Sequence, residues 1–247
     1  VGVAQNSWLI AGGWNGSIAV ASAELYNWVT GVFTLTGSMK QSRYNHTATL
    51  IDPVKGRVLI AGGEGATNAV SEAEIYDQTT GQFTVTGAMH ESRANHTATW
   101  LSTSKKVLIV GGGHAVNNNS IGWGQVATAE LYDVATGKFT LTGSMQQARE
   151  KHTATLLGYG QRVLIIGGHD WDPNGAMDPS SYLASAELYD LATGHFTAAG
   201  TLKQGRDGHT ATFLGNNQLI VLGGGTEAIV NGSPATPSIN SAEIWND

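Results

Sequence analysis

The segment with the clearest chemical spacing is 170–178, which has oxygen-bearing side chains at positions 1, 3, 5 and 9. This spacing lets a tight loop direct carboxylate and amide oxygens at a hard cation, while Gly175 at position 6 makes the turn. Position 12 is Ser181 and not the bidentate glutamate of an EF-hand loop. The run therefore predicts either a calcium loop or a loop held by Asx turns without metal. The candidate ligands, at positions 1, 3, 5 and 9, are Asp170, Asp172, Asn174 and Asp178.

Aromatic, imidazole and amide groups gather in the segments that follow five Gly-Gly doublets. These segments are longer in the last three copies. An exposed aromatic ring beside amide or imidazole groups suits the surface of a sugar or a peptide. A tryptophan in such a segment can equally pack its own loop against the protein. The candidate ligand-binding residues in these segments are Trp14, His114, Trp123, His169 and Trp171.

The composition excludes several kinds of chemistry. The 247 residues include no Cys, which excludes a disulfide framework, a thiolate zinc site and thiol catalysis. The formal net charge is −6 and there is no basic run, so we do not expect nucleic acid as a partner. No apolar run approaches the roughly 20 residues of a membrane-spanning helix, so we do not expect membrane insertion. We assign no catalytic residue, although four residues could supply a base, namely Glu150, Lys151, Asp207 and Glu227.

All these residues belong to a repeat that runs through the chain. An Ala-Glu box follows each Gly-Gly doublet and ends in an aromatic residue. Residues that recur, such as Glu74 in all five copies and His96 in four, are expected to serve the scaffold, whereas residues that break the repeat are candidates for function. The doublets are Gly12-Gly13, Gly62-Gly63, Gly111-Gly112, Gly167-Gly168 and Gly223-Gly224, and the aromatic residues are Tyr26, Tyr76, Tyr132, Tyr189 and Trp245.

Each copy predicts four short strands. In the second copy, residues 47–50, 73–76 and 83–86 alternate between polar and apolar, which is typical of strands. Residues 58–61 are apolar throughout, as expected of a strand that is covered on both faces. Residues 77–81 supply the Asp, Thr and Gly of a turn. Such a four-stranded unit indicates one blade of a β-propeller, so the sequence predicts an all-β propeller of five blades.

The chain resembles the kelch-repeat β-propeller family, whose blades are like those in the central domain of galactose oxidase. The resemblance rests on the doublets, the aromatic residues after them, the aromatic residues like Phe33, and lead-ins such as Arg93 to His96. It implies one propeller domain over 1–247, with incomplete first and last blades. The absence of Cys excludes the copper-radical cofactor of galactose oxidase, which is a Cys–Tyr crosslink. The expected blade units are approximately 1–43, 44–93, 94–149, 150–206 and 207–247.

One arginine recurs in each connection between copies. In kelch propellers that bind acidic peptides, arginines at this motif position surround the central channel and hold carboxylates. The resemblance implies the same ligand-binding role here, and Tyr44 after the first arginine is a further candidate. The alternative is that the arginines form hydrogen bonds between neighbouring blades. The four arginines are Arg43, Arg93, Arg149 and Arg206.

These observations favour a non-enzymatic interaction propeller that recognises a protein, peptide or glycan through its loop face. One alternative is a structural module of a surface assembly that self-associates by sharing strands through the incomplete terminal blades. A second alternative is a carbohydrate-active enzyme such as a kelch-type sugar epimerase. Strands rich in Thr and Gly, few Lys and the candidate calcium loop suit an extracellular or periplasmic location.

Overall fold

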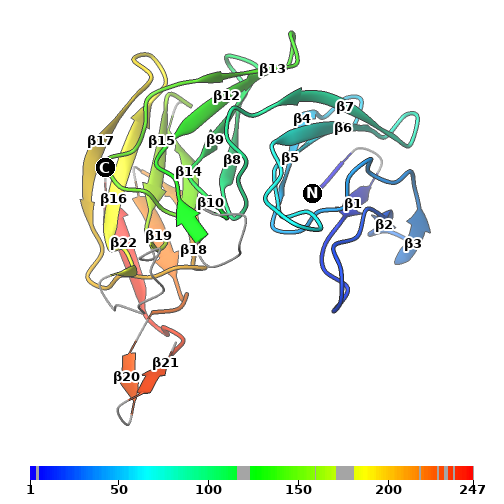
Figure 1. Cartoon of the computed structure of the whole chain (residues 1–247). Helices are drawn as coiled ribbons and strands as arrows, with labels where there is room; N and C mark the ends of the chain where they lie inside the picture. The colour runs from blue at the N-terminus through cyan, green and yellow to red at the C-terminus, as the bar shows by residue number, and fades with distance from the viewer. Residues whose placement is uncertain are drawn as a thin grey trace. The chain divides into compact units, whose positions relative to one another are not determined.

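A computed structural model describes residues 1–3, 6–115, 123–158, 160–170, 181–216, 218–226, 228–230, 233–235 and 237–246. Its regular elements are β-strands that pair in antiparallel sheets, and no described residue lies in an α-helix (Figure 1). Within the same residues, no helix has the length and apolar character needed to cross a membrane. The structure is therefore all-β, as the sequence predicted.

Five sheets follow one another along the chain, and we number them 1 to 5. Sheet 1 has the order β1-β2-β3 and sheet 2 the order β4-β5-β6-β7. Sheet 1 comprises β1 (Ser7–Ala11), β2 (Ala23–Asn27) and β3 (Val32–Leu35), and sheet 2 comprises β4 (Thr47–Asp52), β5 (Arg57–Ala61), β6 (Glu72–Asp77) and β7 (Gln82–Ala88).

Sheet 3 has the order β13-β12-β9-β8, and a two-stranded hairpin, β10-β11, lies between its second and third strands in the sequence. The sequence did not predict this hairpin. Sheet 3 comprises β8 (Thr97–Leu101), β9 (Lys106–Val110), β12 (Ala129–Asp133) and β13 (Lys138–Leu141), and the hairpin comprises β10 (Gly113–Ala115) and β11 (Trp123–Gln125).

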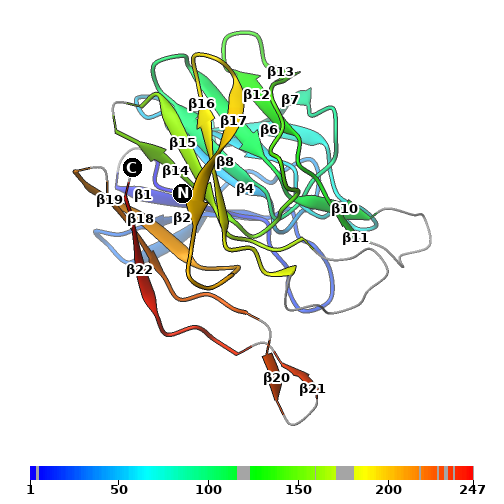
Figure 2. The same ribbon diagram turned by 90° about the vertical axis from the view of Figure 1, so that its left-hand side faces the viewer.

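Sheet 4 has the order β14-β15-β16-β17 and sheet 5 the order β18-β19-β22. A second unpredicted hairpin, β20-β21, projects away from sheet 5 (Figure 2). The strands are β14 (Thr153–Leu157), β15 (Arg162–Ile166), β16 (Ser185–Asp190), β17 (His195–Thr201), β18 (Thr210–Gly215), β19 (Gln218–Leu222), β20 (Ala228–Val230), β21 (Ser233–Ala235) and β22 (Ala242–Asn246).

Sheet 2 shows why the repeated sequence forms these strands. The apolar strand β5 is buried on both faces, and Val58 and Ile60 have no exposed surface. At the far end of β6, Asp77 Oδ1 accepts a hydrogen bond from the amide of Thr79, and Asp77 O accepts one from the amide of Gly81. Gly81 has a φ of 67°, which favours glycine, so this turn returns the chain into β7. The predicted strands and turn are confirmed here.

The chain divides into two compact units, 1–108 with 130–140 and 109–129 with 141–247. In the first unit, Leu9 of sheet 1 packs in one cluster with Val58 and Ile60 of sheet 2. In the second unit, Ile166 of sheet 4 packs in one cluster with Leu219 of sheet 5. Sheets 1 and 2, and likewise sheets 4 and 5, thus pack against each other through apolar side chains. The single domain over 1–247 and its blade boundaries stay a prediction.

Candidate functional site

The four repeated arginines are fully buried, with no exposed surface. Arg43 donates to the backbone oxygens of Gly62 and Glu72 at 2.7 and 2.9 Å, and to Glu74 Oε1 at 3.0 Å. Arg149 repeats the pattern in sheet 4, with Glu187 as its carboxylate partner at 3.0 Å. The guanidinium groups therefore face acceptors of the protein itself, which favours bonding between neighbouring repeats over capture of a ligand carboxylate.

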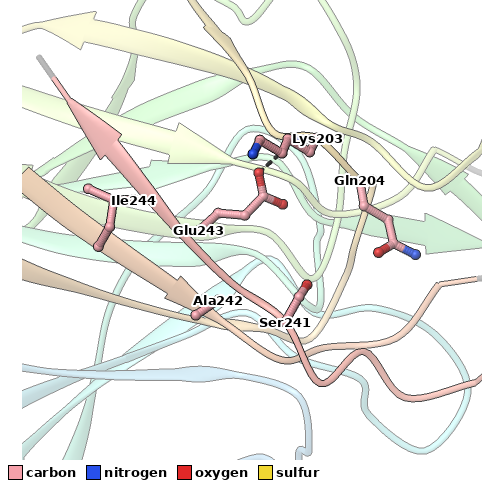
Figure 3. A pocket seen from close by; sticks show the side chains of 6 residues that line it. All are labelled: Lys203, Gln204, Ser241, Ala242, Glu243 and Ile244. Atoms are coloured by element: carbon pink, nitrogen blue, oxygen red, sulfur yellow. Dashed lines mark hydrogen bonds between the residues drawn. The ribbon is translucent and has the colours of Figure 1, made fainter.

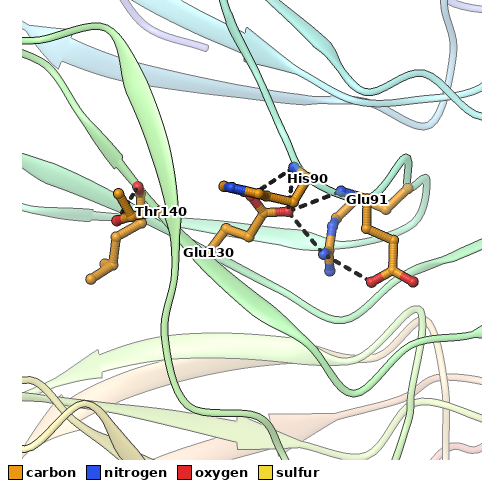
Figure 4. A network of polar contacts seen from close by, with 6 residues as sticks. His90, Glu91, Glu130 and Thr140 are labelled. Atoms are coloured by element: carbon orange, nitrogen blue, oxygen red, sulfur yellow. Dashed lines mark hydrogen bonds and ion pairs between the residues drawn. The ribbon is translucent and has the colours of Figure 1, made fainter.

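The repeated glutamates complete the same network, as the sequence predicted. Glu130 lies at its centre in sheet 3 and is fully buried (Figure 4). It accepts hydrogen bonds from the amide of His90 at 2.9 Å and from Arg93 at 3.3 Å, and the His90 ring Nδ1 lies 2.8 Å from it. A buried carboxylate with several donors is satisfied where it lies. We therefore assign the arginine–glutamate pairs to the scaffold.

The repeated histidines also serve the scaffold. His96 and His209 are 5% and 6% exposed, and their Nε2 atoms lie 2.9 Å from the hydroxyls of Thr47 and Thr153 in the preceding sheet. Burial lowers the pKa of His96 to about 3 and that of His209 to about 4, because the charged imidazolium loses its hydration there. Both rings are therefore neutral near pH 7.

Two positions of the repeat vary between copies, and the structure brings them together. One is the residue after each arginine, and the other is the residue after each Gly-Gly doublet. They face each other across an antiparallel bridge, for example Tyr44 with Glu64 and Glu150 with His169. Because the backbone is the same while the side chains change, chemistry at these positions is not dictated by the fold.

The first cluster of such residues lies in the first unit, and we call it the aromatic–carboxylate cluster: Trp14, Tyr44, Asn45 and Glu64. The indole of Trp14 is 54% exposed and lies 5.2 Å from the ring of Tyr44. The Tyr44 hydroxyl donates to Glu64 Oε2, and Asn45 Nδ2 donates to Glu64 Oε1 at 3.0 Å. The hydrogen bond to Glu64 raises the pKa of Tyr44 to about 12. The hydroxyl therefore stays protonated as a donor.

Short hydrogen-bonded loops hold this cluster in place. After Trp14, the Asn15 side chain accepts hydrogen bonds from the amides of Ser17 and Ile18 at 3.0 and 2.9 Å, which closes an Asx turn. After Glu64, the amide of Gly65 donates to the backbone oxygen of Asn68 at 2.9 Å. Both loops are closed locally, so the cluster side chains project from well-defined backbone.

The second cluster lies in the second unit and is centred on His169. Its Nε2 lies 2.8 Å from Glu150 Oε1, and its Nδ1 lies 2.8 Å from Asp207 Oδ2. The ring is 2% exposed, with Tyr182 beside it at 6.0 Å between ring centroids. Both ring nitrogens thus face a carboxylate. We call His169, Glu150 and Asp207 the histidine–carboxylate cluster.

Charges around His169 decide its protonation. Burial by itself would lower the pKa of His169, but hydrogen bonds and negative charge from Asp207 and Glu150 outweigh it, and the pKa is raised. When it is protonated, the ring donates from both nitrogens, one to each carboxylate. Burial raises the pKa of the neighbouring Asp170, against the lowering effect of the Arg149 and His169 charges. The cluster is an internally satisfied ion network.

The predicted ligand-binding residues therefore separate into groups. Trp14 and Tyr44 meet in the aromatic–carboxylate cluster, and His169 anchors the other cluster. His114 is half-buried in the β10-β11 hairpin, where its backbone faces Gly124, and Trp123 begins β11. Trp171 lies outside the described residues.

Sequence reasoning missed Glu64 as a site residue. Trp14, Gly113, His169 and Gly225 stand at its position in the other copies, so its break from the repeat was a usable signal. Asn45 was missed because Asn95 repeats it, and only the hydrogen bond to Glu64 distinguishes it. Glu150 and Asp207 were considered as bases but not as partners of His169.

Of the candidate calcium ligands, only Asp170 is described, and Asp172, Asn174 and Asp178 lie outside the described residues. The amide of Asp170 donates to Ser181 O at 2.9 Å, which closes the base of this loop. In the part of the chain that the structure describes, no group of three or more His, Asp or Glu side chains could hold a metal ion. The calcium loop stays a prediction.

A pocket lies beside β22, the edge strand of sheet 5 (Figure 3). Its lining includes Glu243, which accepts hydrogen bonds from the amide of Lys203 at 2.7 Å and from Arg206 at 2.7 Å. Glu243 is thus occupied by the scaffold network of sheet 5, and we assign no ligand to this pocket. Its lining residues are Lys203, Gln204, Ser241, Ala242, Glu243 and Ile244.

A comparison of the chain with models of protein families gives no match, and a comparison with curated proteins gives none either.

Proposed function

We propose that the chain is a kelch-type β-propeller of five blades that acts as a non-enzymatic binding module, in an extracellular or periplasmic setting. Sheets 1 to 5 would be its blades. The ligand would bind on the side of the sheets where the loops after the Gly-Gly doublets meet the connections between repeats. That side carries the two positions at which the copies differ.

The observation that carries this proposal is the contrast between repeated and unrepeated residues. Repeated charged residues such as Arg43 and Glu74 are buried and bonded to one another. Three residues that do not recur, Trp14, Tyr44 and Glu64, instead form the aromatic–carboxylate cluster together with Asn45, and Trp14 is more than half exposed there. A fold needs the buried, bonded residues throughout the repeat, whereas recognition of a ligand needs its contact residues at one place only.

Binding is favoured over acid–base catalysis by the state of His169. Both of its ring nitrogens lie 2.8 Å from carboxylates and the ring is almost fully buried. A general base must reach the proton that it removes, with one nitrogen directed at the substrate. The histidine–carboxylate cluster therefore supports a structural link between repeats more than a catalytic centre.

The test is a binding screen of the whole chain against peptides, proteins and glycans on arrays. Trp14→Ala removes the exposed indole on the proposed binding side. Trp28→Ala is the matched control, because Trp28 is 57% exposed and follows β2 at the opposite end of sheet 1. We expect a hit that Trp14→Ala weakens and Trp28→Ala does not. No hit in any class, or a hit that is turned over to product, would overturn the proposal.

A further inference from the structure

We propose that the aromatic–carboxylate cluster is a subsite for a neutral sugar unit of a glycan. This inference rests on the proposed binding function and names the class of ligand. It is carried by an exposed indole and an oriented carboxylate that are linked by Tyr44: Trp14 contacts the Tyr44 ring, and Glu64 accepts hydrogen bonds from Tyr44 and Asn45.

The indole supplies an apolar platform. Trp14 is 54% exposed, and the Tyr44 ring packs against it with an interplanar angle of 54°. The contact restrains the indole while more than half of the side-chain surface stays open to solvent. A pyranose ring presents a face of C–H groups that packs on such a surface, much as other apolar groups pack on aromatic rings.

The carboxylate supplies acceptors for hydroxyl groups. Glu64 is half-buried, and each of its oxygens already accepts one hydrogen bond, from Tyr44 or from Asn45. An ionised carboxylate has about four acceptor sites, so each oxygen retains capacity for a further donor. Asn45 is exposed and adds an amide oxygen next to the carboxylate. Neighbouring acceptors of this kind suit the adjacent hydroxyls of a sugar.

The same geometry disfavours an anionic ligand and an ammonium group held between the two rings. An anionic group would meet the negative charge of Glu64, while Arg43, the nearest repeated cation in the sequence, is fully buried and bonded to Glu74. An ammonium group held between two aromatic faces needs room between the rings. The centroids of Trp14 and Tyr44 are 5.2 Å apart, so the two rings touch each other and leave no such space. Hydroxyl donors therefore fit better than an anion, and the Lys-containing peptides in the test below distinguish them from an ammonium group on the single open face of Trp14.

The repeat provides an internal control for the folding role of these residues. At the positions of Tyr44 and Glu64, the next copy has Ala94 and Gly113. Ala94 is fully buried, and sheet 3 still forms its four strands. The scaffold therefore works without a tyrosine or a carboxylate at these two positions. Their side chains can be exchanged without removing a part that every repeat needs.

The test is isothermal titration of the whole chain with neutral hexasaccharides of glucose, xylose, mannose and N-acetylglucosamine, alongside a library of Lys-containing and Asp-containing peptides. We expect one hexasaccharide to bind, with about tenfold weaker binding for Trp14→Ala and for Glu64→Gln. Trp28→Ala should bind like the unmodified chain. A double variant, Tyr44→Ala with Glu64→Gly, copies the pair in sheet 3 and should fold, by circular dichroism and thermal melting, but not bind.

The outcomes separate this inference from the proposed function. A hexasaccharide that binds equally well to Trp14→Ala and Glu64→Gln would overturn the subsite and leave the binding function standing. A peptide that binds through Trp14 would overturn the sugar assignment in the same way. Binding of neither class, together with no hit on the arrays, would overturn both.

Discussion

The buried histidines predict that this protein loses stability steeply in weak acid. His96 and His209 are neutral in the folded protein because burial lowers their pKa to about 3 and about 4. In the unfolded chain a histidine has a pKa of roughly 6.5. Between these values the unfolded state binds more protons, so the free energy of unfolding decreases as the pH falls. The stabilising contribution is complete above about pH 6.5 and is lost progressively down to about pH 4.

The magnitude follows from proton linkage. Each histidine that is protonated only in the unfolded state changes the free energy of unfolding by about 1.4 kcal/mol per pH unit. Two such residues give about 3 kcal/mol per pH unit, or about 5 to 6 kcal/mol between pH 6.5 and pH 4.5. Natural domains are stable by roughly 5–15 kcal/mol in total. The predicted loss equals the lower end of that range, so we expect a strongly lowered urea midpoint at pH 4.5.

The assay is urea denaturation followed by tryptophan fluorescence at half-unit steps from pH 7.5 to pH 4.5. His96→Gln should reduce the slope of unfolding free energy against pH by about 1.4 kcal/mol per unit. His195→Gln is the control, because this side chain lies on the exposed surface of β17. A slope that His96→Gln leaves unchanged would refute the assignment of His96 as a buried neutral ring.

Three further substitutions test the scaffold, each by urea denaturation at pH 7.5. Arg149→Met leaves the Glu187 carboxylate buried without its cation and should cost about 3–5 kcal/mol, and an unchanged midpoint would contradict the buried pair. Gly87→Ala places a Cβ against the backbone oxygen of Gly137 and should cost about 1–3 kcal/mol, unlike Gly2→Ala, where nothing lies within 4 Å. Tyr189→Phe removes a hydroxyl contact of 2.8 Å with the neighbouring repeat and should cost about 1 kcal/mol, so a stabilised variant would argue against that bond.

The strands and their pairing order were predictable because they depend on local patterns that recur. Residues 58–61 are apolar throughout, and the Asp77 turn uses backbone and side-chain groups only a few residues apart. The hairpins β10-β11 and β20-β21 were not predicted, since neither is part of the repeated pattern and each lies within a long loop. Comparison of the copies predicts structure only where the copies agree.

The sequence by itself determined which residues are scaffold, because a requirement of the fold must recur along the chain, as Glu74 does in five copies and His96 in four. It also determined that Trp14, Tyr44 and His169 are exceptions to the repeat. Only the tertiary structure decided their partners. Tyr44 and Glu64 are 20 residues apart in the sequence, and Glu150 and His169 are 19 apart. Each pair meets because antiparallel strands return the loop to the connection before it. The tertiary structure also decided the role of the arginines. From the same sequence position, a guanidinium group can reach either a ligand or a neighbouring glutamate. In this fold the arginines are buried and bonded to the glutamates.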